Sequence, residues 1–216
     1  TALVESILVP FSLDGMPMVP KPLNATIDSR YQPSQDSLDG LERQLSDDAK
    51  QRLAQGVDFL VDPMVEIIVK VYSAQFKRSD LDYSDDAIQD LVKDWISNEC
   101  NVHELFVSRS LPMNEMIRAF INMSVDDSKA SLDYCIGQVW RHCQPTIYKS
   151  LSHNSCSDEV FNEIINLDER LKRYSYGPPV LSLLQLEALI NADVIETSFL
   201  DDPDIDLTSK GWNFNR

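Results

Sequence analysis

The spacing of apolar residues predicts a succession of amphipathic helices from residue 37 onward. Stripes at intervals of three and four residues recur, and this period places apolar side chains on one helix face. The stripes span Leu38–Leu45, Met64–Tyr72, Ile88–Ile96, Met113–Ile121, Leu132–Cys143, Val160–Leu171 and Leu183–Ile190. We therefore expect a mainly α fold, a globular multi-helix domain with little β structure.

Local signals indicate where several of these helices begin. Ser46-Asp47-Asp48, Ser84 and Ser157 carry side-chain oxygens that can cap a helix N-terminus. Asp62-Pro63 predicts another start, because proline is tolerated where no amide donor is needed, and Ser182 predicts the last one.

Prolines and one glycine predict where two helices end. Pro145 is expected to end or kink the helix that contains the stripe Leu132–Cys143, because its ring clashes with the carbonyl four residues earlier. Gly177-Pro178-Pro179 is expected to stop the helix before it completely.

The two ends of the chain differ from the helical domain predicted for residues 37–193. Residues 1–36 hold five of the eleven prolines and predict an irregular, extended wrap, with a turn at Ser12–Gly15. Residues 194–216 predict one short strand, Val194–Leu200, followed by a solvated acidic turn, Asp201–Asp206. Since one strand cannot form a sheet, it either pairs with the N-terminal region or belongs to a sheet encoded elsewhere.

Composition limits the partners and the compartment. The 19 Lys and Arg against 35 Asp and Glu give a net charge of −16, which disfavours nucleic acids and anionic membranes. No apolar run is long enough to cross a bilayer, and Thr1–Glu5 does not resemble a signal peptide. Cys100, Cys135, Cys143 and Cys156 are therefore expected to be reduced core residues of a cytoplasmic protein.

Candidate chemistry is sparse in this sequence. All six glycines are isolated, so the chain has neither a dinucleotide fingerprint nor a phosphate loop. His103-Glu104 begins like a zinc-protease helix but has Val107 at the second ligand position. Cys135 and Cys143 would stand about 12 Å apart along one helix, too far for a single zinc ion. We predict no metal site, and no residue is assigned a catalytic role.

Two aromatic clusters, Val139–Pro145 and Lys172–Pro179, are open to two interpretations. In the first, Trp140 belongs to the core, Arg173 serves a helix C-terminus and the tyrosines pack over a rigid turn. In the second, the rigid Gly177-Pro178-Pro179 holds Tyr174 and Tyr176 beside a groove, where their rings contact a flat ligand or another domain.

Taken with other segments, these clusters resemble a family of bacterial FAD/NAD(P)-binding proteins of the oxidoreductase class. The other segments are Pro10–Gly15, Met18–Asn24, Leu132–Gly137, Leu183–Ala192 and Leu200–Ile205. In that family a glycine-rich, Rossmann-type half binds FAD, and a largely helical region interrupts or follows it. The resemblance implies that this chain is the helical region alone, with the Rossmann-type half of the same polypeptide as its partner.

Two functions follow as hypotheses. The first, which the resemblance implies, is a helical accessory domain that covers the FAD and NAD(P) cleft of the parent protein without binding a cofactor by itself. The residues predicted to face that cleft are Trp140, Arg141, His142, Arg173, Tyr174 and Tyr176. The second is an acidic protein-interaction module with no catalytic role, which the net charge of −16 favours.

Overall fold

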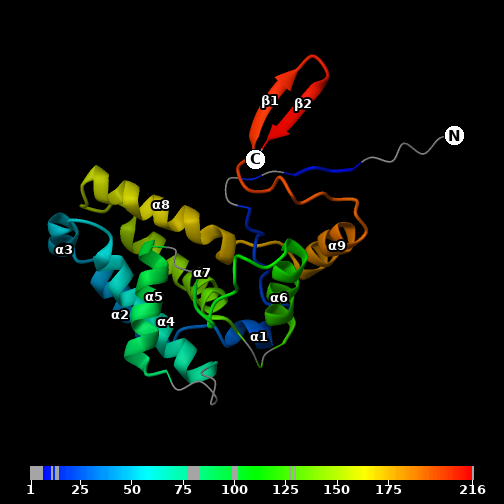
Figure 1. The fold of residues 1–216 in the computed structure, drawn as a ribbon. Coiled ribbons are helices and arrows are strands. Elements are labelled where there is room, and N and C mark those ends of the chain that lie inside the picture. Colours follow the sequence, from blue (N-terminus) through cyan, green and yellow to red (C-terminus); the bar gives the residue numbers. More distant parts are fainter. Residues whose placement is uncertain are drawn as a thin grey trace.

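A computed structural model describes residues 7–10, 12, 15–76, 83–98, 102–126, 128 and 130–215. These residues form a mainly helical domain, as predicted, and near the C-terminus they also form one two-stranded hairpin (Figure 1). The helices are α1 (Ala25–Ser29), α2 (Gln35–Leu45), α3 (Asp48–Leu53), α4 (Asp58–Gln75), α5 (Asp85–Asn98), α6 (Met113–Val125), α7 (Leu132–Leu151), α8 (Asp158–Ser175) and α9 (Val180–Asn191). The strands are β1 (Asp204–Thr208) and β2 (Gly211–Asn215). Thr1–Glu5, Leu13, Asp14 and Cys100, on which predictions were made, lie outside the described residues.

Helix α7 lies at the centre of the main core. It contacts α2, α4, α5 and α8, and its side chains are buried on most of its surface. Trp140 and Tyr134 of α7 are fully buried together with Tyr31 and Phe120. Cys135 and Cys143 are buried free thiols, as expected, and burial raises the pKa of Cys143 to about 12.

The predicted N-terminal caps are confirmed. The Asp47 carboxylate accepts hydrogen bonds from the amides of Ala49 and Lys50 at 3.0 and 3.2 Å. The hydroxyl of Ser84 accepts from the third residue after it at 3.2 Å, and that of Ser157 does so at 3.3 Å. Each such cap stabilises its helix by about 1 kcal/mol.

Two predicted helix starts are wrong, and of the two outcomes predicted at Pro145, an end or a kink, the end does not occur. Helix α4 begins at Asp58, so Pro63 lies inside it rather than at its start. Helix α7 runs through Pro145 to Leu151, and α9 begins at Val180 instead of Ser182. A proline inside a helix costs about 3 kcal/mol. Both α4 and α7 bury so many side chains that hydrophobic burial, about 1.5 to 3 kcal/mol for each large apolar residue, outweighs that cost.

A second, smaller core lies between α6 and α9. Ile117 and Ile121 of α6 pack with Val180 and Leu183 of α9. Beside them the Glu187 carboxylate is buried, and Arg118 forms a bidentate ion pair with it, with Nε 2.6 Å from Oε1. This pair joins the two helices.

The segments that lead into and out of the helical body lie side by side. The Leu8 amide donates to Val194 at 2.9 Å, and the Ser12 amide donates to Leu200 at 2.8 Å. The carbonyls of Leu8 and Ser12 in turn accept from Glu196 and Asp202. Each pair is an isolated parallel bridge, so Val194–Leu200 is not the continuous strand that was predicted, although it does pair with the N-terminal region.

Residues 1–36 and 194–216 contain more regular structure than predicted. Helix α1 and the start of α2 lie within the first range, and β1 begins at Asp204, inside the predicted acidic turn. The extended part of the N-terminal region does cross the helices, because the amide of Val19 donates to Arg173 at 3.0 Å. Across the described ranges, none of the helices has both the length and the apolar character that a membrane span requires.

Candidate functional site

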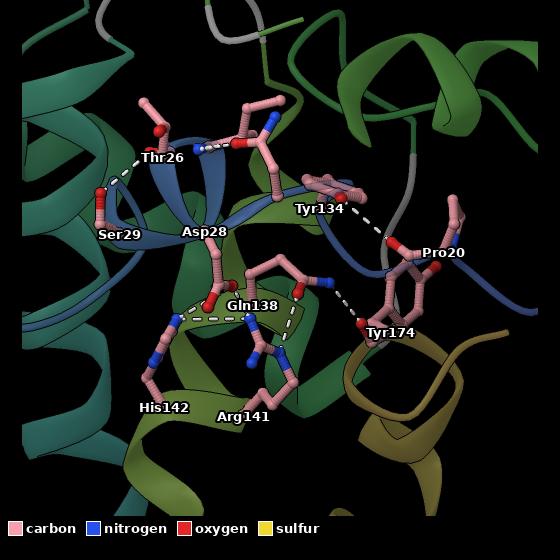
Figure 2. A network of polar contacts seen from close by, with 11 residues as sticks. Pro20, Thr26, Asp28, Ser29, Tyr134, Gln138, Arg141, His142 and Tyr174 are labelled. Atoms are coloured by element: carbon pink, nitrogen blue, oxygen red, sulfur yellow. Dashed lines mark hydrogen bonds and ion pairs between the residues drawn. The ribbon is translucent and has the colours of Figure 1, made fainter. Parts of the chain in front are cut away.

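Arg141 and His142 belong to a polar network between α1 and α7, shown in Figure 2. The Arg141 guanidinium forms an ion pair with the Asp28 carboxylate, and His142 Nε2 lies 3.3 Å from Asp28 Oδ1. Arg141 Nε also donates to the Gln138 side chain at 3.0 Å, and Gln138 Nε2 donates to the backbone carbonyl of Tyr174 at 2.7 Å. The network therefore connects α1, α7 and the C-terminal end of α8.

Burial determines the electrostatics of this network. The side chains of Arg141 and His142 are only 20% and 16% exposed. Burial, reinforced by the neighbouring Arg141, lowers the pKa of His142, and Asp28 only partly opposes this effect. His142 is therefore neutral at pH 7, and the Arg141–Asp28 pair holds the charge in this network. The arrangement fixes α1 against α7.

Trp140 lies in a different place, beneath a groove between α7 and α8. Its Nε1 donates to Asp168 at 3.0 Å, Gln144 donates to the same carboxylate at 3.1 Å, and the Tyr148 hydroxyl does so at 2.8 Å. Burial and then hydrogen bonds with Asp168 and Tyr176 raise the pKa of Tyr148, so its hydroxyl is a donor at neutral pH. The groove has a volume of about 360 Å³ and is otherwise lined mainly by apolar side chains, among them Ile147, Leu151, Phe161, Ile164 and Ile165.

Arg173 and Tyr174 lie near the C-terminal end of α8, away from the Arg141 network and from the groove above Trp140. The Tyr174 ring is buried and makes edge-to-face contacts with Trp95 and Phe120, at centroid distances of 5.1 and 6.2 Å. Arg173 is half-buried and lines a hollow of about 230 Å³ that also includes Arg109. Such contacts are typical of a packed core with a basic edge.

The predicted cleft residues thus do not form one surface. Trp140 and Tyr174 have buried rings, Arg141 and His142 are held by Asp28, and Tyr176 is 47% exposed. Lys21 Nζ lies 5.6 Å above the Tyr176 ring. Arg141 and His142 stay together in the network with Asp28, and Arg173 and Tyr174 line one hollow, but the two pairs and Trp140 lie in different places.

A larger cavity, of about 570 Å³, was missed by the sequence analysis. It lies where the terminal segments meet the beginning of α6. Arg109 contributes a cation to its lining, Glu196 and Asp201 contribute carboxylates, and Met16 and Met113 contribute flexible thioethers. These residues come from three distant parts of the chain and form no motif, so local pattern could not bring them together.

Gly15 helps to shape this cavity. Its φ of +63° is in the left-handed region that favours glycine, and its amide donates to the Ser12 hydroxyl at 3.0 Å. A β-carbon at this position would stand 3.2 Å from that of Asp201, so the two terminal segments approach closely here. The cavity wall therefore depends on the pairing of these segments. Among the described residues, no cluster of histidine, cysteine and carboxylate side chains suits a metal ion.

No family model matches this chain, and comparisons with curated proteins and with solved structures also yield no match.

Proposed function

We propose that this chain is the helical accessory domain of a cytoplasmic FAD/NAD(P)-binding oxidoreductase. It packs against the Rossmann-type half of the same polypeptide and covers the cleft in which that half binds its cofactors. Its contribution is to exclude water from the neighbourhood of the reacting flavin. The segments that resemble this family support the proposal, as do two features of the terminal region.

The single observation that carries the proposal is the exposed apolar surface around the terminal segments. Ile7 and Leu8 are 63% and 58% exposed, and on neighbouring α9 Leu181 and Leu189 are 66% and 41% exposed. A group of exposed large apolar side chains marks a surface that another protein unit covers. The cavity beside Arg109 opens between the same segments, so a unit docked there would close over it.

This assignment gives the predicted residues separate roles. Tyr176 is exposed and Arg173 is half-buried, so these two are available to touch the covered cleft. Trp140, Arg141 and His142 face inward instead, and they join α7 to α8 through Asp168 and to α1 through Asp28. The cofactors are held by the other half, and this domain supplies no phosphate-binding loop.

The test uses the complete product of the natural gene. We expect that purified protein to show the visible absorption of bound flavin and to be reduced by NAD(P)H. In the same protein, Leu181→Ser should lower the free energy of unfolding by about 1.5 to 3 kcal/mol, because the leucine becomes buried against the second half. In the 216-residue chain alone the same change should have little effect, since Leu181 is 66% exposed there.

Leu53→Ser is the matched control, because Leu53 is 77% exposed and lies at the end of α3, far from α9 in Figure 1. It should leave stability unchanged in both proteins. A complete product that contains no flavin and is not reduced by NAD(P)H would overturn the proposed function.

The second candidate, an acidic protein-interaction module, is favoured by the net charge of −16. It predicts a partner whose association rate falls steeply as salt rises, because exposed charges are screened beyond about 8 Å at physiological ionic strength. Association that does not respond to salt would exclude this candidate.

A further inference from the structure

The hollow of about 230 Å³ near the C-terminal end of α8 is rich in cations, although the whole chain has a net charge of −16. Among the described residues that line it, four side chains are cationic and one is a carboxylate. They are Arg109, Arg170, Lys172 and Arg173 against Glu169. The hollow is therefore a local exception to the acidity of the chain.

The three arginines supply the positive charge of the hollow. Lys172 forms an ion pair with Glu169 and lies 4.0 Å from Asp168 Oδ2, so its own charge is largely neutralised. Helices α5 and α8 both end beside the hollow, and a helix C-terminus carries about half a negative charge. Among the described residues, about two positive charges then remain.

The arginines have donors to spare for a ligand. Arg170 Nη2 donates to the backbone carbonyl of Ile96, and all three arginines take part in further interactions. A guanidinium has five N–H donors in a planar fork, so these contacts still leave donors for a second acceptor. This fork matches the oxygens of a phosphate or a carboxylate.

Trp95 adds a neutral donor at the same place. It lines the hollow and is only 4% exposed, and in the part of the chain that the structure describes its Nε1 has no hydrogen-bond partner. The Tyr174 ring holds the indole through an edge contact at a centroid distance of 5.1 Å. Because a buried donor without an acceptor is unfavourable, the indole N–H favours an oxygen-bearing ligand in the hollow.

We propose that this hollow binds the phosphate group of a small phosphate monoester. Such a group carries a charge between about −1.5 and −2 at pH 7 and has three strong acceptor oxygens. Its charge matches the two positive charges that remain, and its oxygens suit the arginine forks and the indole N–H. The site lies within this chain, so it does not depend on a second half of the polypeptide.

Size and lining determine what the rest of the ligand is. Pockets for drug-sized ligands begin at about 300 Å³, so a hollow of about 230 Å³ suits a smaller compound. Met18 and the two aromatic rings, Trp95 and Tyr174, offer an apolar surface to its organic part. A nucleic acid is disfavoured, because the net charge of −16 would repel its other phosphates.

Isothermal titration calorimetry of the 216-residue chain, in a buffer without phosphate, tests the proposal with three probes. Phenyl phosphate should bind with a dissociation constant below about 1 mM. Inorganic phosphate should bind more weakly because it lacks the organic part. Benzoate should also bind more weakly, because it has the ring but only one negative charge.

NMR of the indole N–H groups shows where phenyl phosphate binds. The signal of Trp95 should move downfield, because its N–H gains an acceptor. The signals of Trp140 and Trp212 should stay in place, because Trp140 already donates to Asp168 and Trp212 is 67% exposed on the hairpin. A shift of these two signals without one at Trp95 would overturn the proposal.

Two variants and one control locate the binding energy. Arg109→Gln should weaken phenyl phosphate binding about tenfold or more without disturbing the fold, since Arg109 lies exposed in a turn. Trp95→Phe keeps an aromatic ring but removes the donor, and it should also weaken binding. Arg52→Gln removes the same charge from α3, where Arg52 is 67% exposed and does not line the hollow, so it should leave binding unchanged.

The other outcomes would overturn the proposal. A dissociation constant above about 1 mM for phenyl phosphate would mean that the hollow is no binding site. Equally tight binding of benzoate would remove the preference for phosphate, and equally tight binding of inorganic phosphate would remove the ester. If Arg52→Gln weakened binding as much as Arg109→Gln, only the overall charge would matter. The flavin content of the complete gene product affects none of these results.

Discussion

Replacing Gly137 by alanine tests how closely α7 and α8 must approach. Gly137 lies in the buried central helix, opposite Tyr174 near the C-terminal end of α8. A β-carbon at Gly137 would lie 2.2 Å from that of Tyr174 and 3.0 Å from its carbonyl carbon. Because the obstructing atoms are the backbone and β-carbon of Tyr174, no side-chain rotation removes the clash.

The expected magnitude follows from two opposing contributions. Ordinary contact begins near 3.4 Å, so the ends of α7 and α8 would have to separate by about 1.2 Å (3.4 − 2.2). Overpacking of this kind costs up to about 3 kcal/mol, and alanine regains about 1 kcal/mol of helix propensity. We therefore expect Gly137→Ala to lower the free energy of unfolding by about 2 kcal/mol. For a chain of this length, that loss corresponds to a melting temperature lower by about 4 to 8 °C.

Urea denaturation followed by circular dichroism measures this change, with Gly40→Ala as the matched control. Gly40 also lies inside a helix, α2, but a β-carbon there would meet nothing closer than Arg43 Nη2 at 3.9 Å. The control should gain about 0.5 to 1 kcal/mol from propensity alone. If both variants were stabilised equally, the close approach of Gly137 to Tyr174 would be refuted.

Three further predictions concern charge and packing. Burial raises the pKa of Asp133 from 3.8 to about 6. The free energy of unfolding should therefore fall by about 3 kcal/mol as the pH rises from about 4 to above 6. Urea titrations at several pH values measure this dependence, and Asp133→Asn should remove it. Gly177→Ala would place a β-carbon 1.4 Å from the Val19 carbonyl oxygen, so hydrogen exchange at the Val19 amide should accelerate; an unchanged rate would contradict this contact. Arg118→Met should cost about 1 to 3 kcal/mol, less than for a fully buried pair because Arg118 is half-exposed, and adding Glu187→Met should recover part of the loss.

The features that could be predicted from the sequence depend on few neighbouring residues. Asp47, Ser84 and Ser157 cap their helices because each side chain bonds an amide only two or three positions away. The apolar stripes likewise determine which helix faces enter the core. Such interactions need no knowledge of the rest of the fold.

The wrong boundaries arose where tertiary burial overrides a local rule. Pro63 and Pro145 each remove one helix hydrogen bond, yet α4 and α7 continue because each helix buries a long apolar face against the core. Ile205 and Leu207 alternate with aspartates, which is a pattern typical of a strand, but the number of carboxylates favoured the prediction of an acidic turn. The partner strand, at Trp212–Phe214, shows why a strand is favoured there.

The candidate site was harder to predict for a different reason. Arg141 and His142 stay together because they are neighbours in sequence, but their ion-pair partner Asp28 lies more than one hundred positions away. The cavity beside Arg109 requires the pairing of Leu8 with Val194 and Ser12 with Leu200. No local signal specifies pairings across such separations.

That pairing also has a mechanical consequence. The backbone enters the helical body past Leu8 and Ser12 and leaves it past Val194 and Leu200, running in the same direction. Pulling the entering and leaving strands apart by their outer ends would load the bridging hydrogen bonds in shear, so they would have to break together. The pulling force would then be carried by these hydrogen bonds and would not reach the helices between residues 15 and 193 until the bonds broke.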